Sequence, residues 1–147
     1  MTLRLSGPPR GLAKAGFDRA LLAQRARRAL RVLDRSRAEL SLALVDDLAM
    51  GELNAAHRGK KGPTDVLSFS LLEGAHVEHR GTLLGDVVID VEQAARQARR
   101  ARRTLDDELA KLLIHGVLHL VGHDHEADDE ARRMRAEERR LWKALVA

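Results

Sequence analysis

Three histidines in the last third of the chain have the spacing of metal ligands. His115 and His119 are four residues apart, and His125 follows six residues later. Residues four apart lie on one face of a helix, so these two imidazoles can reach a common ion. Gly122 is expected to end the helix and turn the chain, which would bring His125 back as a third ligand. Three neutral nitrogen ligands with an open fourth position are typical of catalytic zinc.

The third ligand has an alternative in the sequence. His123 also lies four residues after His119, but a helix that stops at Gly122 favours His125. All of these side chains could instead be ordinary core or incidental histidines. Their ligand spacing within an apolar run argues against that reading. Because the chain has no cysteine, a transition metal would have to be held by His, Asp or Glu.

The pattern H-x-x-x-H-x-x-G-x-x-H is also the ligand spacing of the metzincin proteases. In those enzymes a glutamate directly after the first histidine is the general base. Gly116 occupies that position here. The missing carboxylate argues against proteolysis and leaves the predicted zinc ligands unaffected. A zinc peptidase or another metallohydrolase remains a rival hypothesis.

Hydrophobic periodicity predicts the elements that position these histidines. The strands are expected at residues 39–45, 65–71 and 82–89, the last two antiparallel, and the helices at 17–33, 47–57, from 90 onward, 105–121 and 128–146. Asp90 with Gln93 and Thr104 with Asp107 resemble capping boxes. The helix over 105–121 is apolar on nearly every side and should be buried. The predicted fold class is α+β, a small mixed β-sheet covered by helices, with the zinc site at the end of the buried helix.

Length and composition set broad limits. The 147 residues fit one domain over 1–147, without disulfides. No signal peptide or membrane-spanning apolar run is visible, so the expected compartment is the cytoplasm. A net charge of +4 favours a polyanionic partner. However, 22 acidic residues accompany the 26 basic ones, and solvated helix faces are the more common explanation of such arginine clusters.

Three segments together resemble the YbeY family of bacterial endoribonucleases. They are Asn54–Arg58 with Pro63–Phe69, Gly85–Ile89, and His115–His125. The resemblance implies a zinc-dependent, single-strand-specific endoribonuclease that acts in 16S ribosomal RNA 3′-end maturation and ribosome quality control. It also implies ribosomal RNA as a partner, with the small ribosomal subunit and assembly proteins as further candidates, and no membrane partner.

The resemblance assigns roles to single residues. It makes His115, His119 and His125 the ligands of one Zn²⁺, with His115 also in the catalytic set, and gives a functional role to Arg58. A guanidinium suits that role because phosphodiester cleavage builds negative charge on the phosphate oxygens. Lys60 and Lys61 are expected to contact phosphates, and Asp124 to orient a ligand histidine. A ribosome-assembly factor with structural zinc and no activity is the second rival.

Overall fold

The computed structural model describes residues 2–12, 16–58, 64–70, 83–123 and 127–146. Its elements in chain order are β1 (Thr2–Ser6), the 3-10 turn η1 (Arg10–Leu12), α1 (Arg19–Val32), β2 (Glu39–Val45), α2 (Asp47–Arg58), β3 (Val66–Ser70), β4 (Leu83–Asp90), α3 (Val91–Ala101), α4 (Leu105–Leu120) and α5 (Asp128–Leu145). The strands and helices expected from periodicity are therefore confirmed, with small shifts at their ends.

The four strands form one mixed sheet in the order β1-β2-β4-β3. β1 pairs with β2 and β2 with β4 in parallel, whereas β3 pairs with β4 antiparallel. This confirms the predicted mixed sheet and the antiparallel pairing of its last two strands. β3 is an edge strand, so a path from one face of the sheet to the other on that side of the molecule runs around β3.

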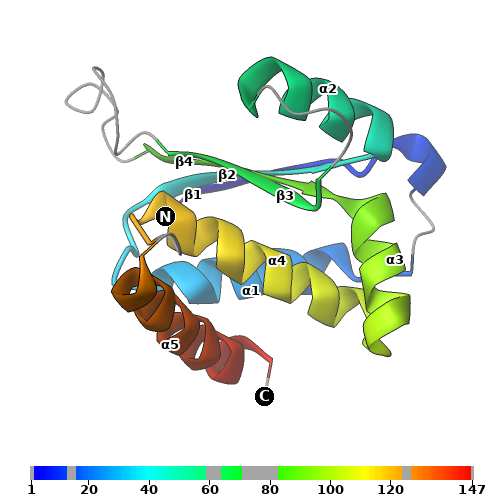
Figure 1. The fold of residues 1–147 in the computed structure, drawn as a ribbon. Coiled ribbons are helices and arrows are strands. Elements are labelled where there is room, and N and C mark those ends of the chain that lie inside the picture. Colours follow the sequence, from blue (N-terminus) through cyan, green and yellow to red (C-terminus); the bar gives the residue numbers. More distant parts are fainter. Residues whose placement is uncertain (1, 13–15, 59–63, 71–82, 124–126, 147) are drawn as a thin grey trace.

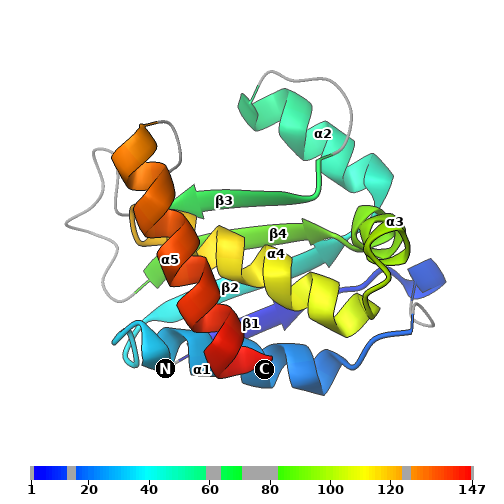
Figure 2. The ribbon, with the colours of Figure 1, turned by 60° about the horizontal axis from the view of Figure 1, so that its bottom comes forward.

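The helices are divided between the two faces of the sheet (Figure 1). α2 lies on one face, and α1, α4 and α5 lie on the other, with α3 at the end of the sheet. α4 runs between the sheet and α5, which crosses it in Figure 2. Eleven of its sixteen residues are buried, which confirms the expected buried helix. Leu109, Leu113 and Val117 are fully enclosed and join the main core with the strands.

Both predicted helix starts are capped by the expected side chains. Asp90 accepts hydrogen bonds from the backbone N–H groups of Glu92 and Gln93, and Thr104 accepts one from that of Asp107. In a capping box the side chain of the third helical residue also bonds back to the backbone N–H of the cap residue. Here the side chains in that position contact an arginine instead. Gln93 Oε1 accepts from Arg96, and Asp107 forms an ion pair with Arg25. The contact at Asp107 ties α4 to α1, whereas the contact at Gln93 stays within α3.

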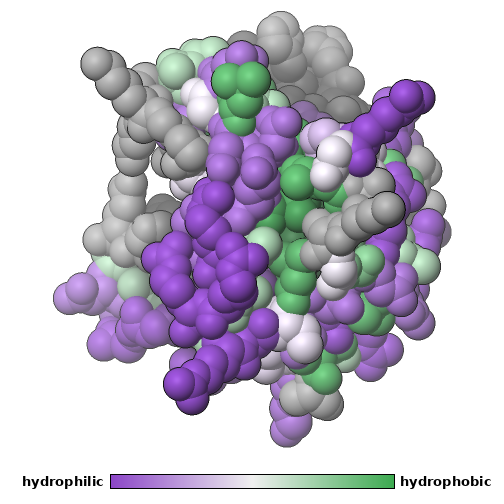
Figure 3. Space-filling view, turned by 90° about the vertical axis from the view of Figure 1, so that its right-hand side faces the viewer, coloured by the Kyte–Doolittle hydropathy of each residue, from purple (hydrophilic) through white to green (hydrophobic). Residues whose placement is uncertain are grey.

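In the view onto the α3 end of the molecule, hydrophilic residues surround a central band of hydrophobic ones (Figure 3). Among the described helices, none combines the length and the apolar character that crossing a membrane requires.

Candidate functional site

His115 and His119 point toward one another from successive turns of α4. Their Nε2 atoms are 3.1 Å apart, and their ring centroids are 4.6 Å apart at an interplanar angle of 75°. Two nitrogen ligands of a tetrahedral zinc ion, each about 2.0–2.1 Å from it, are separated by about 3.3–3.4 Å. Both side chains are half-buried on a helix whose other faces are packed. The arrangement therefore fits a shared metal ion.

The end of α4 is a Schellman motif. The N–H of Gly122 donates to the carbonyl of His119, and the N–H of His123 donates to that of Leu118. Gly122 has φ +100°, a conformation that L side chains rarely adopt. This confirms that the glycine ends the helix. His123 consequently lies beyond the helix, and its spacing from His119 no longer places the two on one helix face.

A carboxylate from α5 faces the far nitrogen of His115. Glu138 Oε2 lies 4.0 Å from His115 Nδ1, on the side of the ring away from His119. In metal sites a carboxylate in this place fixes the tautomer and the direction of the ligand imidazole. The sequence pattern indicated Asp124 for that task and gave no sign of Glu138. Nothing in the sequence spacing could have found it, because the contact depends on how α5 crosses α4.

Gly116 packs directly against the sheet. A Cβ atom at this position would lie 2.7 Å from Val87 Cγ1 and 3.2 Å from Ser68 Oγ. The Ser68 hydroxyl also donates to the Gly116 carbonyl at 2.9 Å. A glutamate could not stand here without moving β3 and β4 away from α4. The protein thus lacks both the metzincin general base and the space for it.

Arg58 is the last residue of α2, on the opposite face of the sheet from α4. Its neighbour His57 contacts Phe69 edge to face, with ring centroids 5.1 Å apart. The preceding strand residue, Ser68, bonds to α4, so β3 separates the end of α2 from the histidine pair. The Arg58 side chain lies outside the described part of the chain.

Lys60, Lys61, Asp124 and His125 also lie outside the described residues. The roles given to them above remain predictions.

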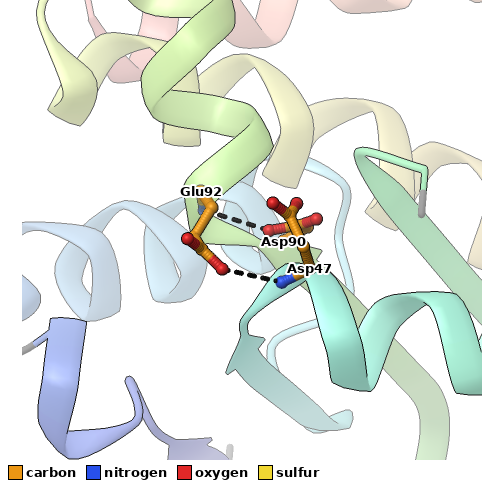
Figure 4. Close-up of side chains that lie close together, drawn as sticks. All are labelled: Asp47, Asp90 and Glu92. Atoms are coloured by element: carbon orange, nitrogen blue, oxygen red, sulfur yellow. Dashed lines mark hydrogen bonds between the residues drawn. The ribbon is translucent and has the colours of Figure 1, made fainter.

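A second group of potential ligands lies where α2 and α3 begin. Asp47, Asp90 and Glu92 each offer an oxygen within 4.8 Å of the others, so they could hold a metal ion (Figure 4). No motif in the sequence pointed to this group, whose members come from separate elements. Glu92 Oε1 accepts from the Asp47 N–H, and Asp90 Oδ1 accepts from the Glu92 N–H, both at 3.0 Å.

Charge within this acidic group is already compensated. Arg96 binds both carboxylate oxygens of Asp47, at 2.7 and 3.0 Å, and holds the Asp47 pKa below its ordinary value. Burial, followed by a hydrogen bond with Asp47, raises the pKa of Asp90 to about 7. A metal ion would have to compete with the guanidinium and with this proton. The group therefore acts as a polar network that joins two helix starts to the sheet.

Comparison with known proteins agrees with the motifs and the fold. The family model described as "Endoribonuclease YbeY" matches residues 14–146. The chain belongs to the YbeY endoribonuclease family. A YbeY endoribonuclease of Anaeromyxobacter sp. is 47% identical over 98% of this chain and 72% of its own length. One from Pelotomaculum thermopropionicum is 42% identical over 85% of this chain and 86% of its own length.

The fold is also found in a solved structure. The solution structure of TM1509 from Thermotoga maritima superposes with a TM-score of 0.59, covering 97% of this chain and 90% of that one. Sequence identity is 22%, so this likeness concerns the fold alone. Membership in the YbeY family supports an RNA-cleaving hydrolase. Of the family's sequence motifs, those on β3, β4 and α4 adjoin one another, whereas Asn54–Arg58 lies on α2, across the sheet from α4.

Proposed function

We propose that this protein is a zinc-dependent endoribonuclease that hydrolyses single-stranded RNA, with its active site at the C-terminal end of α4. The observation that carries the proposal is the convergence of His115 and His119, with Nε2 atoms 3.1 Å apart. Membership in the YbeY endoribonuclease family supports RNA as the substrate. One metallohydrolase domain over residues 1–147 would contain the whole site.

Separate residues of the chain would bind the metal ion, orient its ligands and contact the RNA. His115, His119 and His125 would hold the ion, which supplies a water of lowered pKa and polarises a phosphoryl oxygen. Glu138, whose Oε2 faces His115 Nδ1 at 4.0 Å, would favour the tautomer that leaves Nε2 free to bind the ion. Asp124 would orient another ligand. Arg58 stabilises negative charge on the phosphate, and Lys60 and Lys61 attract the strand.

The position of Arg58 limits the path by which its guanidinium could reach the scissile phosphate. Because α2 and α4 lie on opposite faces, a guanidinium from the end of α2 would meet the scissile phosphate around the edge strand β3. The substrate strand would then pass this edge of the sheet. Arg58→Ala should fold, keep its zinc and bind RNA nearly as well, yet cleave about 10²–10³ times more slowly.

Single-turnover cleavage with saturating enzyme tests this role. Arg58→Lys should restore only part of the rate, since a point charge cannot reproduce the planar fork. Arg37→Ala, which removes an arginine from the turn before β2, is the matched control and should cleave like wild type. A wild-type rate for Arg58→Ala would show that the residue does not act in catalysis. Cleavage of DNA of the same sequence at an equal rate would contradict the RNA preference, which depends on the 2′-hydroxyl groups.

The rival functions make different predictions. A peptidase would need a general base that Gly116 does not provide and that the packing against Val87 excludes at this position. Metal-dependent cleavage of an unstructured peptide, abolished by His119→Ala, would favour it. An assembly factor with structural zinc would show no RNA turnover, and its unfolding would depend strongly on the metal.

We infer that the cellular task is maturation of the 16S ribosomal RNA 3′ end and ribosome quality control in the cytoplasm. Family membership supports ribosomal RNA as the substrate class. The small ribosomal subunit and its assembly proteins are the proposed partners. Accumulation of 16S precursors with unprocessed 3′ ends in a strain that carries only His119→Ala would test this assignment.

A further inference from the structure

A pocket of about 400 Å³ is lined mainly by side chains of α4 and α5. Its volume falls within the range of small-molecule sites. It is lined by Arg103, Lys111, Ile114, Glu138, Arg139 and Trp142. Glu138 is also the carboxylate that faces His115 Nδ1, so one side chain borders both the pocket and the proposed metal site.

The position of Lys111 gives the distance from pocket to metal site. Lys111, His115 and His119 follow one another at intervals of four residues along α4, so they share one helix face. Each interval advances about 6 Å along the axis. Lys111 therefore stands one helical turn from His115, roughly the step from one phosphate to the next in an extended strand.

The side chains of the pocket combine cations with an aromatic surface. Lys111 and Arg139 are exposed, and neither has an ion-pair partner among the described residues. Arg103 is neutralised by the buried Glu108 at 2.7 Å and lies over the Trp142 ring, 5.5 Å from its centroid. Trp142 is half-buried and packs against the cluster around Ile114. The pocket therefore has two cations without an ion-pair partner among the described residues and an indole over which Arg103 lies.

We propose that this pocket binds one nucleotide of the RNA strand next to the cleaved phosphate, with its phosphate on Lys111 and Arg139 and its base against Trp142. Such a site is chemically coherent because aromatic surfaces take up unstacked bases regardless of sequence. The two cations hold the backbone. The proposal rests on the function proposed above. It makes the groove between α4 and α5 the path of the strand as it leaves the metal site.

Trp142 is the only tryptophan in the chain, so its fluorescence reports directly on this pocket. The probe is a 2′-O-methyl RNA hexamer, in which the methyl group replaces the hydroxyl hydrogen at each 2′ position. Its titration should quench Trp142 as a base packs on the indole. Anisotropy of the same hexamer, labelled at one end, measures total binding independently of the pocket.

Two double variants with the same loss of charge separate the pocket from general basicity. Lys111→Ala with Arg139→Ala should raise the hexamer's Kd about tenfold and flatten its dependence on salt by about 0.7–1.4 in logarithmic slope. Arg27→Ala with Arg37→Ala removes two exposed cations, on α1 and in the turn before β2, that do not line the pocket. This control should keep both the quenching and the wild-type slope.

The outcomes distinguish failure of the pocket proposal from failure of the proposed endoribonuclease function. Hexamer binding by anisotropy without quenching, or equal weakening in both double variants, would overturn the pocket while leaving RNA cleavage intact. Trp142→Leu provides a second check: it should weaken binding about 5- to 150-fold if circular dichroism shows a wild-type fold. Absence of both RNA binding and cleavage in the wild type would overturn the proposed function, and the pocket proposal with it.

Discussion

At the scale of single residues, the metal site depends on the direction in which each imidazole points. The structure brings His115 and His119 together and turns the chain away from the helix before His123. We expect about one zinc per chain, lost in His115→Ala, His119→Ala and His125→Ala and retained in His123→Ala. Metal analysis of the purified variants measures this. Full zinc content in His125→Ala together with loss in His123→Ala would reverse the ligand assignment.

Glu138 permits a test of how His115 is oriented. Glu138→Gln removes the charge that faces His115 Nδ1 and should weaken zinc binding about 10- to 100-fold, with the fold preserved. Competition with a zinc chelator measures the affinity. Glu137→Gln is the matched control on the same turn of α5, because Glu137 pairs with Arg140 instead. Equal zinc affinities in the two variants would show that Glu138 does not contribute to zinc binding.

At the scale of elements, the packing of α4 on the sheet explains why Gly116 is a glycine. Alanine is a better helix former by about 1 kcal/mol, but its Cβ would lie 2.7 Å from Val87 Cγ1. Overpacking of this kind typically costs about 1–3 kcal/mol. We therefore expect Gly116→Ala to lower the free energy of unfolding in urea. Gly11→Ala, whose Cβ would meet nothing within 4 Å, should leave it nearly unchanged.

At the scale of the whole molecule, the network of Asp47, Asp90 and Arg96 couples stability to pH. Asp90 has an ordinary pKa of 3.8 and a folded pKa of about 7, so the folded state holds its proton more tightly. Its contribution to stability is complete below about pH 4, falls as the pH rises toward 7, and is constant above. The lowered pKa of Asp47 acts in the opposite direction, with a contribution that is lost in more acidic solution.

Asp90→Asn isolates this effect. Asparagine keeps the N-cap of α3 and an N–H donor toward Asp47, but it does not titrate. The difference in unfolding free energy between wild type and variant should therefore shift in favour of the variant between pH 4.5 and pH 7.5, by more than about 1 kcal/mol. Urea unfolding across this range measures it. A difference that does not change with pH would show that Asp90 is ionised throughout.

The sequence alone determined the features that depend on neighbours along the chain. The spacing of His115 and His119, the helix end at Gly122, and the caps at Asp90 and Thr104 follow from helix periodicity and terminal hydrogen bonding, which act over a few residues. The motifs also indicated the family. The pattern of apolar residues predicted β2, β3 and β4 and the antiparallel pairing of the last two, but it did not predict β1 or the parallel pairings.

Only the tertiary structure decided which distant residues meet. Glu138 reaches His115, Trp142 and Lys111 border one pocket, and Val87 excludes a side chain at Gly116, all through packing between separate elements. The placement of α2 on the face opposite α4 likewise sets the path that Arg58 must take. None of these contacts has a fixed spacing in sequence, because the crossing of two helices or the order of strands in a sheet depends on how whole surfaces fit together.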